Sequence, residues 1–367
     1  MVDQIIARGS IAREAGKPAE IEEIVVPAPG PGEARVRILA SGVCHTDLSA
    51  KSGVFGPDVF PLLLGHEGAG IVESVGEGVT NVKEGDYVIL AWRAPCGNCR
   101  FCLAGKPHLC AASLNATNRM TAKSDGVELN PVLGIGTFCT YTLVHSRQCV
   151  PVSAELPPEQ MSLIGCGVMT GVGAALYSAS VEPGSAVAVF GCGGVGDSVI
   201  MGARLAGATK IIAVDLDPRK LEWAKEFGAT DLVNPNDGDP VAKIKELTGG
   251  FGVNYSFEAV GRADTLEQAI FCRDLAGTCV MIGVAGPTAT LDKLPLGRFF
   301  DLGGSLRVSW YGDCLPTRDF PMLAEWYRQG RLDLDRVVTR RISLDEVEEA
   351  FEAMHRGETL RSVITFA

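Results

Sequence analysis

Four cysteines crowd into one short segment of the chain with the spacing C-x2-C-x2-C-x7-C, namely Cys96, Cys99, Cys102 and Cys110. Thiolates at such a spacing can surround one small ion, and Zn²⁺ binds cysteine sulfur at about 2.3 Å. An iron–sulfur cluster is the alternative, but runs such as C-x2-C-x2-C-x3-C-P differ in spacing. A zinc held by four cysteines has no open coordination position, so the sequence predicts a structural zinc that stabilises a loop.

A second set of possible ligands is built differently, from Cys44, His66 and Cys166. Each lies beside or close to glycine, which allows the backbone to approach an ion closely. Taken singly, buried cysteines and a core histidine are the plainer interpretation. Three protein ligands leave one position of a tetrahedral zinc open, and an open zinc is a catalytic one. The two sets together predict two zinc ions per chain.

A glycine-rich turn, G-x-G-x-x-G, runs from Gly191 to Gly196 and includes Gly193, Gly194 and Val195. It follows an apolar strand predicted at 187–190 and opens a helix predicted at 195–205. In that context the pattern is typical of a dinucleotide-binding loop. Its glycines permit close approach to the pyrophosphate, whose charge meets the helix N-terminus.

Asp215 lies at the end of the next predicted strand, 210–214, where an acid can bind the adenosine ribose hydroxyls. A carboxylate there repels a 2′-phosphate, so the predicted cofactor is NAD rather than NADP. The alternative, that Asp215 only caps the following helix, is weaker because Asp217 precedes Pro218 and is the better-placed cap.

The elements that must position these residues change in character near residue 160. Before it, short alternating segments divided by Gly and Pro indicate an all-β, barrel-like domain. After it, apolar strands alternate with helical patterns, which indicates a parallel doubly wound sheet. Helix 345–355 and strand 362–366 close the chain, and that strand is expected to return to the first domain. The predicted class is α/β.

Composition narrows the range of partners. The formal net charge is −11, which disfavours nucleic acid and anionic membrane surfaces. No targeting segment or membrane-spanning run is evident. The chain has twelve cysteines, five of them in the four-cysteine run and at the first position of the open site. This usage favours a reducing compartment, and we expect a cytoplasmic protein.

These motifs resemble those of the zinc-dependent medium-chain alcohol dehydrogenases, from near the N-terminus to Ala367. The resemblance implies a GroES-like β-barrel catalytic domain over residues 1–167 and 309–367. It also implies an NAD-binding Rossmann domain over residues 168–308. The expected activity is hydride transfer from a zinc-bound alcohol to NAD, in a homodimer or homotetramer.

The resemblance also implies roles for single residues. Cys44, His66 and Cys166 hold the catalytic zinc, with Asp47 supporting His66 and Glu67 able to approach the metal. Thr46 takes the substrate proton, but Ser49 stands where many members have a relay histidine. The remaining roles concern the cofactor: Lys220 contacts the adenosine ribose, and His45 and Arg361 lie near the pyrophosphate.

A finer resemblance concerns the substrate. Segments 133–138, 143–146, 165–169 and 309–314 are similar to S-(hydroxymethyl)mycothiol dehydrogenases, which oxidise a formaldehyde–thiol adduct. Trp92, Arg93 and Phe138 fall at positions that line the family's substrate cleft; the plainer alternative is that the two aromatics are core residues. The other candidate is a general NAD-dependent dehydrogenase of primary, aromatic or terpenoid alcohols.

Overall fold

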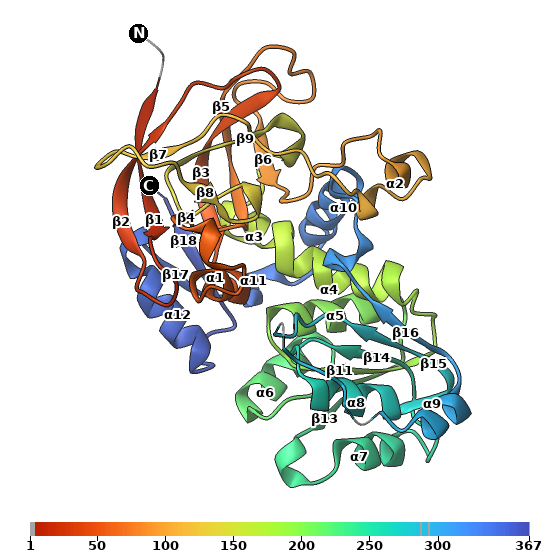
Figure 1. The fold of residues 1–367 in the computed structure, drawn as a ribbon. Helices are drawn as coiled ribbons and strands as arrows, with labels where there is room; N and C mark the ends of the chain where they lie inside the picture. The colour runs from red at the N-terminus through yellow and green to blue at the C-terminus, as the bar shows by residue number, and fades with distance from the viewer. Residues whose placement is uncertain (1–3, 287, 293, 367) are drawn as a thin grey trace. The chain divides into compact units, whose positions relative to one another are not determined.

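The computed structural model describes residues 4–286, 288–292 and 294–366 and divides into two compact units. The first unit comprises Met1–Cys166 and Leu315–Ala367, and the second comprises Gly167–Cys314. Figure 1 shows the C-terminal segment, in blue, returning to the unit that begins with the red N-terminal strands. Like the predicted domains, the two compact units assign the C-terminal segment of the chain to the N-terminal unit.

The first unit is built on two sheets of short strands. The smaller has the order β7-β2-β1-β4-β8 and the larger the order β10-β6-β5-β3-β18-β17, with β9 paired to β3. The strands of the smaller sheet are β1 (Ile5–Ala12), β2 (Glu20–Val26), β4 (Leu62–Leu63), β7 (Thr121–Ala122) and β8 (Asn130–Pro131). Those of the larger are β3 (Glu33–Gly42), β5 (Gly68–Val75), β6 (Tyr87–Leu90), β9 (Tyr141–His145), β10 (Cys149–Pro151), β17 (Val338–Ile342) and β18 (Arg361–Thr365).

The C-terminal strand β18 is an integral part of the larger sheet. It pairs antiparallel with β3, where Val363 lies opposite Gly42, and parallel with β17. The predicted return of strand 362–366 to the first domain is confirmed. The unit's helices are α1 (His45–Lys51), α2 (Arg100–Leu103), α3 (Pro158–Leu163), α10 (Pro316–Arg328), α11 (Leu334–Val337) and α12 (Val347–His355).

The second unit is organised around one parallel sheet of order β13-β12-β11-β14-β15-β16. Its strands are β11 (Ala186–Phe190), β12 (Lys210–Val214), β13 (Asp231–Val233), β14 (Val253–Glu258), β15 (Arg273–Met281) and β16 (Ser305–Val308). The strand order reverses between β11 and β14, and in such sheets ligands bind beyond the carboxyl ends of the strands at this switch.

Helices cover this sheet (Figure 1). Helix α5 contacts β11 and β12, α6 contacts β12 and β13, α7 contacts β13, and α8 contacts β11, β14 and β15. They are α5 (Gly194–Leu205), α6 (Pro218–Phe227), α7 (Pro240–Leu247), α8 (Ala263–Phe271) and α9 (Leu296–Leu302). Buried side chains such as Phe190, Val214, Ile244 and Ile270 form one core cluster between strands and helices. The predicted doubly wound α/β architecture is thus the one observed.

The second unit extends further along the chain than the prediction of 168–308. Its last segment, 309–314, is held by residues of the preceding helical run, because the Ser178 hydroxyl lies 2.8 Å from Ser309 Oγ and 2.7 Å from an Asp313 carboxylate oxygen. A Cβ on Gly173 would also lie 2.4 Å from the Gly312 carbonyl oxygen. This close packing keeps the segment with the second unit up to Cys314.

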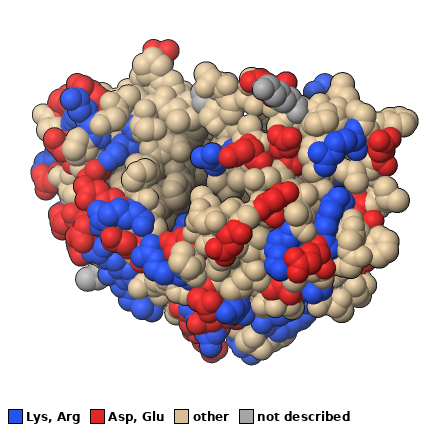
Figure 2. Space-filling view, turned by 90° about the horizontal axis from the view of Figure 1, so that it is seen from below, with Lys and Arg blue, Asp and Glu red and all other residues tan. Residues whose placement is uncertain are grey.

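One helical run among the described residues, Pro158–Ser178, is long and apolar enough to pass a membrane-span test. Most of its apolar window, 78%, is buried inside the structure, as in the core helix of a folded domain. On the face shown in Figure 2, acidic and basic side chains are interspersed. That face therefore lacks the single-signed region that binding to a polyanion requires.

Candidate active site and cofactor site

The four cysteines of the crowded segment converge. The sulfur atoms of Cys99 and Cys102 lie 3.6 Å apart, those of Cys110 and Cys96 3.6 Å, and those of Cys99 and Cys110 3.9 Å. All four are free thiols. Backbone N–H groups, first that of Cys102, lower the pKa of Cys99 to about 6, which favours a thiolate ligand. This closed set of soft ligands fits zinc.

The second ligand set also comes together, in the first unit. The ligand atoms of Cys44, His66, Glu67 and Cys166 all lie within 4.8 Å of one another. They come from three places in the fold: Cys44 caps α1, His66 and Glu67 lie between β4 and β5, and Cys166 lies in a π-helical turn, Ile164–Val168, that follows α3. Residues far apart in sequence therefore share one small volume.

His66 is oriented by Asp47. Its Nδ1 lies 2.9 Å from Asp47 Oδ1, which also accepts the Gly65 N–H at 3.0 Å. The other ring nitrogen, Nε2, is buried and has no hydrogen-bond partner among the described residues. A carboxylate on one nitrogen fixes the tautomer and leaves the other nitrogen as a metal ligand. The orphaned Nε2 is what a metal site requires, so the residues fit zinc.

Gly65 makes this arrangement possible. Its φ is +93°, and a Cβ there would lie 2.4 Å from the Phe138 backbone nitrogen. Any other residue would clash and strain the turn that presents His66.

Glu67 forms a buried ion pair with Arg361, whose guanidinium also donates to the Val43 carbonyl at 3.2 Å. Both side chains are nearly or fully buried. Burial raises the pKa of Glu67 to about 7, and the Arg361 charge opposes that shift. Sequence reasoning missed this pair because nothing local links positions 67 and 361. The resemblance implies a place for Arg361 near the pyrophosphate, and the structure shows its guanidinium paired with the Glu67 carboxylate.

Helix α1 carries the residues expected to move the proton. Thr46 and Ser49 are both partly exposed and lie three positions apart, so they share one face of the helix. His45, the first residue of α1, is exposed. Asp47 is fully buried and its other oxygen accepts the Cys44 N–H at 3.4 Å.

The residues predicted to line the substrate cleft occupy different surroundings. Phe138 is fully buried in a core cluster, with its ring centroid 6.3 Å from that of Phe351. Trp92 is partly buried against another cluster. Arg93 donates to the Cys110 carbonyl and so connects the chain after β6 to the four-cysteine segment. Phe138 therefore packs as a core aromatic, while Trp92 and Arg93 keep some exposure.

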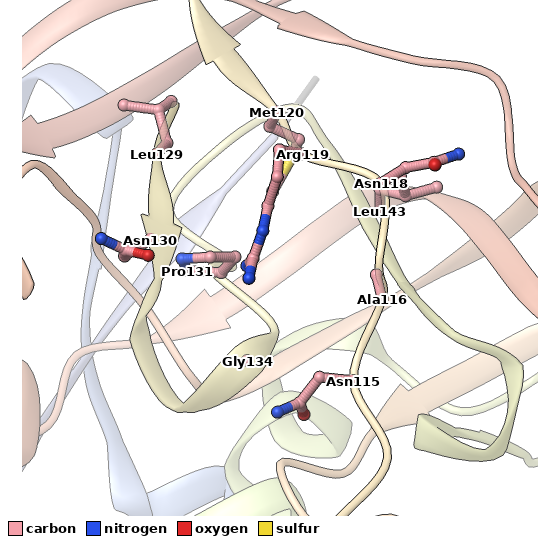
Figure 3. Close-up of a pocket in the computed structure, with 10 residues that line it drawn as sticks. All are labelled: Asn115, Ala116, Asn118, Arg119, Met120, Leu129, Asn130, Pro131, Gly134 and Leu143. Atoms are coloured by element: carbon pink, nitrogen blue, oxygen red, sulfur yellow. The ribbon is translucent and has the colours of Figure 1, made fainter. Parts of the chain in front are cut away.

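A separate cavity of about 170 Å³ opens in the first unit (Figure 3). Its lining residues are Asn115, Ala116, Asn118, Arg119, Met120, Leu129, Asn130, Pro131, Gly134 and Leu143. Neither the metal ligands nor the three predicted substrate-pocket residues are among them, so this cavity is not the predicted substrate site.

The glycine-rich loop has the predicted form. It follows β11, and its Gly194 begins α5. A Cβ on Gly196 would lie 1.7 Å from the Gly191 carbonyl oxygen, so the turn cannot close around any larger residue. A Cβ on Gly193 would meet nothing within 4 Å. That open side, at a helix N-terminus, is where a diphosphate can approach the backbone.

Asp215 follows β12 directly and faces this loop. One of its carboxylate oxygens accepts the Cys192 N–H at 2.8 Å, and the other accepts the Asp217 N–H at 2.9 Å. The cap of α6 is Asp217, whose side chain accepts the Arg219 N–H at 2.9 Å. The alternative role of Asp215 as the helix cap is therefore wrong. Lys220 lies in the first turn of α6.

A unit with one closed and one open zinc site, joined to a unit that binds a dinucleotide, defines a zinc-dependent dehydrogenase. Comparison with known proteins agrees: residues 30–154 match the alcohol dehydrogenase GroES-like domain, and residues 194–329 match the zinc-binding dehydrogenase domain. The protein belongs to the zinc-dependent medium-chain alcohol dehydrogenase family and uses NAD and zinc.

Relatives match over nearly the full length. An alcohol dehydrogenase class-3 from Drosophila melanogaster is 41% identical, with 99% of this chain and 98% of that protein covered. An S-(hydroxymethyl)glutathione dehydrogenase from Escherichia coli is 40% identical, with 98% and 100% covered. The crystal structure of a benzyl alcohol dehydrogenase from Acinetobacter calcoaceticus superimposes with a TM-score of 0.91 at 32% identity, with both chains fully covered.

Proposed function

We propose that the enzyme oxidises the S-hydroxymethyl adduct that formaldehyde forms with a small thiol, with mycothiol as the thiol. The observation that carries the adduct chemistry is the full-length similarity to an enzyme named for the corresponding glutathione adduct. The choice of mycothiol rests on the resemblance of segments 133–138, 143–146, 165–169 and 309–314. The product of the reaction is the S-formyl thioester.

The roles of the chain's own residues follow from the site. Cys44, His66 and Cys166 would hold the catalytic zinc, and Asp47 orients His66 through Nδ1. Zinc supplies a Lewis acid that lowers the pKa of a hydroxyl. We assign Thr46 to accept the substrate proton and Ser49, on the same face of α1, to pass it outward. The glycine loop and Asp215 bind the cofactor that accepts the hydride.

The test is a comparison of kcat/KM for formaldehyde with mycothiol, with glutathione and without thiol, in the presence of NAD. We expect turnover with mycothiol at least roughly tenfold above the other two conditions, since a site built for one tail leaves polar groups unpaired with another. Equal turnover with glutathione and with mycothiol would support oxidation of a thiol adduct and would contradict specificity for mycothiol. A kcat/KM for formaldehyde that does not change when either thiol is added would contradict the proposal.

The second candidate is a general alcohol dehydrogenase, which the similarity to the benzyl alcohol dehydrogenase favours. Partial burial of Trp92 suits either substrate. A panel of benzyl, terpenoid and short primary alcohols distinguishes the two candidates. A kcat/KM for a free alcohol above that for every thiol adduct would establish the second one.

We also propose that the chain forms a homodimer or homotetramer in the cytoplasm. Support comes from the edge of the parallel sheet, where β16 has one neighbour and large exposed apolar residues, including Val308 at 69%, Trp310 at 47% and Leu306 at 40% exposed. Such edges attract a second copy unless charge protects them. Light scattering of the wild type and of Val308→Lys tests this: the variant should be smaller in mass, and a monomeric wild type would contradict it.

A further inference from the structure

Glu258, the last residue of β14, lies where the strand order of the parallel sheet reverses. It is paired in register with Phe190, the last residue of β11, which directly precedes the glycine-rich loop. The Glu258 side chain is fully buried. A buried carboxylate is costly unless hydrogen bonds compensate it, so its hydrogen-bond partners indicate its role.

One carboxylate oxygen of Glu258 binds the turn that connects β14 to α8, residues 259–262. Oε1 accepts the N–H groups of Val260 at 2.9 Å and Gly261 at 2.8 Å. It also accepts the hydroxyl of Thr265, in the first turn of α8, at 2.8 Å. Three donors that converge on one oxygen hold the turn in one conformation.

The other side of the carboxylate is closed by the chain after β15. A Cβ on Gly283 would lie 2.8 Å from Glu258 Oε2 and 2.1 Å from the Gly261 nitrogen. The N–H groups of Ile282 and Gly283 donate to the Glu258 carbonyl at 2.8 and 2.9 Å. Oε2 itself has no hydrogen-bond partner in the described part of the chain. The hydrogen bonds of this side chain therefore all serve the turn and the start of α8.

The turn 259–262 packs directly against the dinucleotide loop. A Cβ on Gly191 would lie 2.7 Å from Val260 Cγ2, and the Ala259 N–H donates to the Phe190 carbonyl at 2.9 Å. Val260 is itself 45% exposed, although Glu258 is fully buried. The turn therefore forms a wall beside Gly191, at the edge where sheets of this kind bind dinucleotides.

We propose that Glu258 is a positioning residue of the cofactor site, which holds the turn 259–262 against the glycine-rich loop in the conformation that binds NAD. Because Glu258 is buried, it acts through the turn and does not touch the cofactor. Without its hydrogen bonds the turn, which contains Gly261 at a φ of +86°, samples other conformations. The apparent dissociation constant then rises by the inverse of the fraction of molecules that can bind. This role is independent of which alcohol the enzyme oxidises.

The experiment measures two quantities on the zinc-loaded enzyme: the NADH dissociation constant, by fluorescence titration, and the free energy of unfolding, by urea denaturation. For Glu258→Ala we expect the NADH constant to rise about tenfold, as when the turn is competent in about a tenth of the molecules. Glu258→Gln keeps an acceptor oxygen for the turn, so its NADH constant should lie between those of the wild type and Glu258→Ala.

The matched control is Asp239→Ala in the same unit. Asp239 also accepts a backbone N–H at the start of a helix, because its side chain accepts the Val241 N–H at 2.9 Å and caps α7. That helix follows β13, the outermost strand, away from the reversal point. The control should lower the free energy of unfolding and leave the NADH constant as in the wild type.

Two results would overturn the proposal. A folded Glu258→Ala protein that binds NADH like the wild type would show that Glu258 only stabilises the fold. An equal rise of the NADH constant in Asp239→Ala would show that general destabilisation is the cause.

Thr265→Val keeps the proposal testable if the Glu258 variants fail to fold. It removes one of the three donors to Oε1 and leaves the carboxylate in place. We expect the NADH constant to rise roughly threefold, since the turn is then only partly released. In that case an NADH constant equal to that of the wild type would overturn the proposal.

Discussion

Arg361 and Glu67 form an ion pair that is buried on both sides and joins the first residue of β18 to the residue beside the predicted metal ligand His66. The pair brings the C-terminal strand into the catalytic site. It also explains how an acid can stand fully buried among two thiols and an imidazole. Buried charges are retained in proteins when they are paired.

Replacing Arg361 by Gln should destabilise the enzyme by about 3–5 kcal/mol, because the Glu67 charge is then buried without compensation. Urea denaturation of the zinc-loaded protein measures this. The control is Arg341→Gln, whose exposed pair with Glu159 at 3.2 Å should cost less than about 1 kcal/mol. Combining Arg361→Gln with Glu67→Gln should recover part of the loss. Equal effects of the Arg361 and Arg341 variants would refute the structural role of the pair.

Metal analysis of protein purified without added zinc should give two equivalents per chain, because two ligand sets of different openness are present. Cys44→Ser should lower the content to one equivalent and abolish turnover. A wild-type value near one, left unchanged by Cys44→Ser, would remove the catalytic zinc site.

Replacing Cys99 by Ser should lower the melting temperature or yield insoluble protein, while the folded fraction keeps ordinary kcat. The reason is that a closed site of four cysteines has no position for substrate and contributes to folding. Thermal denaturation and active-site-normalised kcat measure the two effects separately. A fully stable variant with lost turnover would contradict this assignment.

Asp215→Asn should shift the ratio of kcat/KM for NAD over NADP from roughly a hundredfold toward equality, since each 1.4 kcal/mol of lost repulsion is worth about tenfold. Asparagine is chosen because its amide oxygen can still accept the Cys192 N–H that the carboxylate accepts in the wild type. Steady-state kinetics with both cofactors provide the ratio. An unchanged ratio would show that Asp215 is not the residue that reads the ribose.

Asp197, in the first turn of α5, is fully buried, and neither carboxylate oxygen has a hydrogen-bond partner in the described part of the chain. Burial therefore raises the pKa of Asp197 well above its usual range, and this predicts a pH dependence of stability. The native state holds the proton at pH values where the unfolded carboxyl has lost it, so the contribution of Asp197 to the free energy of unfolding should fall as the pH rises above about 4. Relative to the wild type, Asp197→Asn should gain stability with increasing pH, by up to about 1.4 kcal/mol per pH unit. Urea denaturation at several pH values measures the difference. A difference that stays constant with pH would mean that Asp197 has an ordinary pKa.

Short sequence patterns predicted those features of the protein that are formed by one short segment of the chain. The Cys96–Cys110 run and the Gly191–Gly196 loop are short, and their spacing alone implies their geometry. Apolar strands that alternate with helical patterns likewise indicated the parallel sheet of the second unit. The observed strand order, β13-β12-β11-β14-β15-β16, is the one common in doubly wound sheets.

The features that could not be predicted from the sequence depend on contacts between residues far apart in the chain. No local sequence pattern indicates that Arg361 pairs with Glu67 or that Arg93 donates to the Cys110 carbonyl. The resemblance implies an end of the second unit at residue 308, whereas the compact unit ends at Cys314, because hydroxyl and carboxylate contacts with Ser178 hold segment 309–314 in place. The burial of Asp197 without a hydrogen-bond partner could not be predicted either, because an acid in the first turn of a helix is common.

Cys166 is both a predicted zinc ligand and the last residue of the first unit, and Gly167 begins the second. The covalent crossing between the units therefore begins directly after a residue whose side-chain sulfur would bind the metal. Zinc removal frees one end of this crossing, so proteases should reach the π-helical turn Ile164–Val168 more readily in the apoenzyme. We therefore expect the predicted catalytic zinc also to restrain the chain at the point where it passes from one unit to the other.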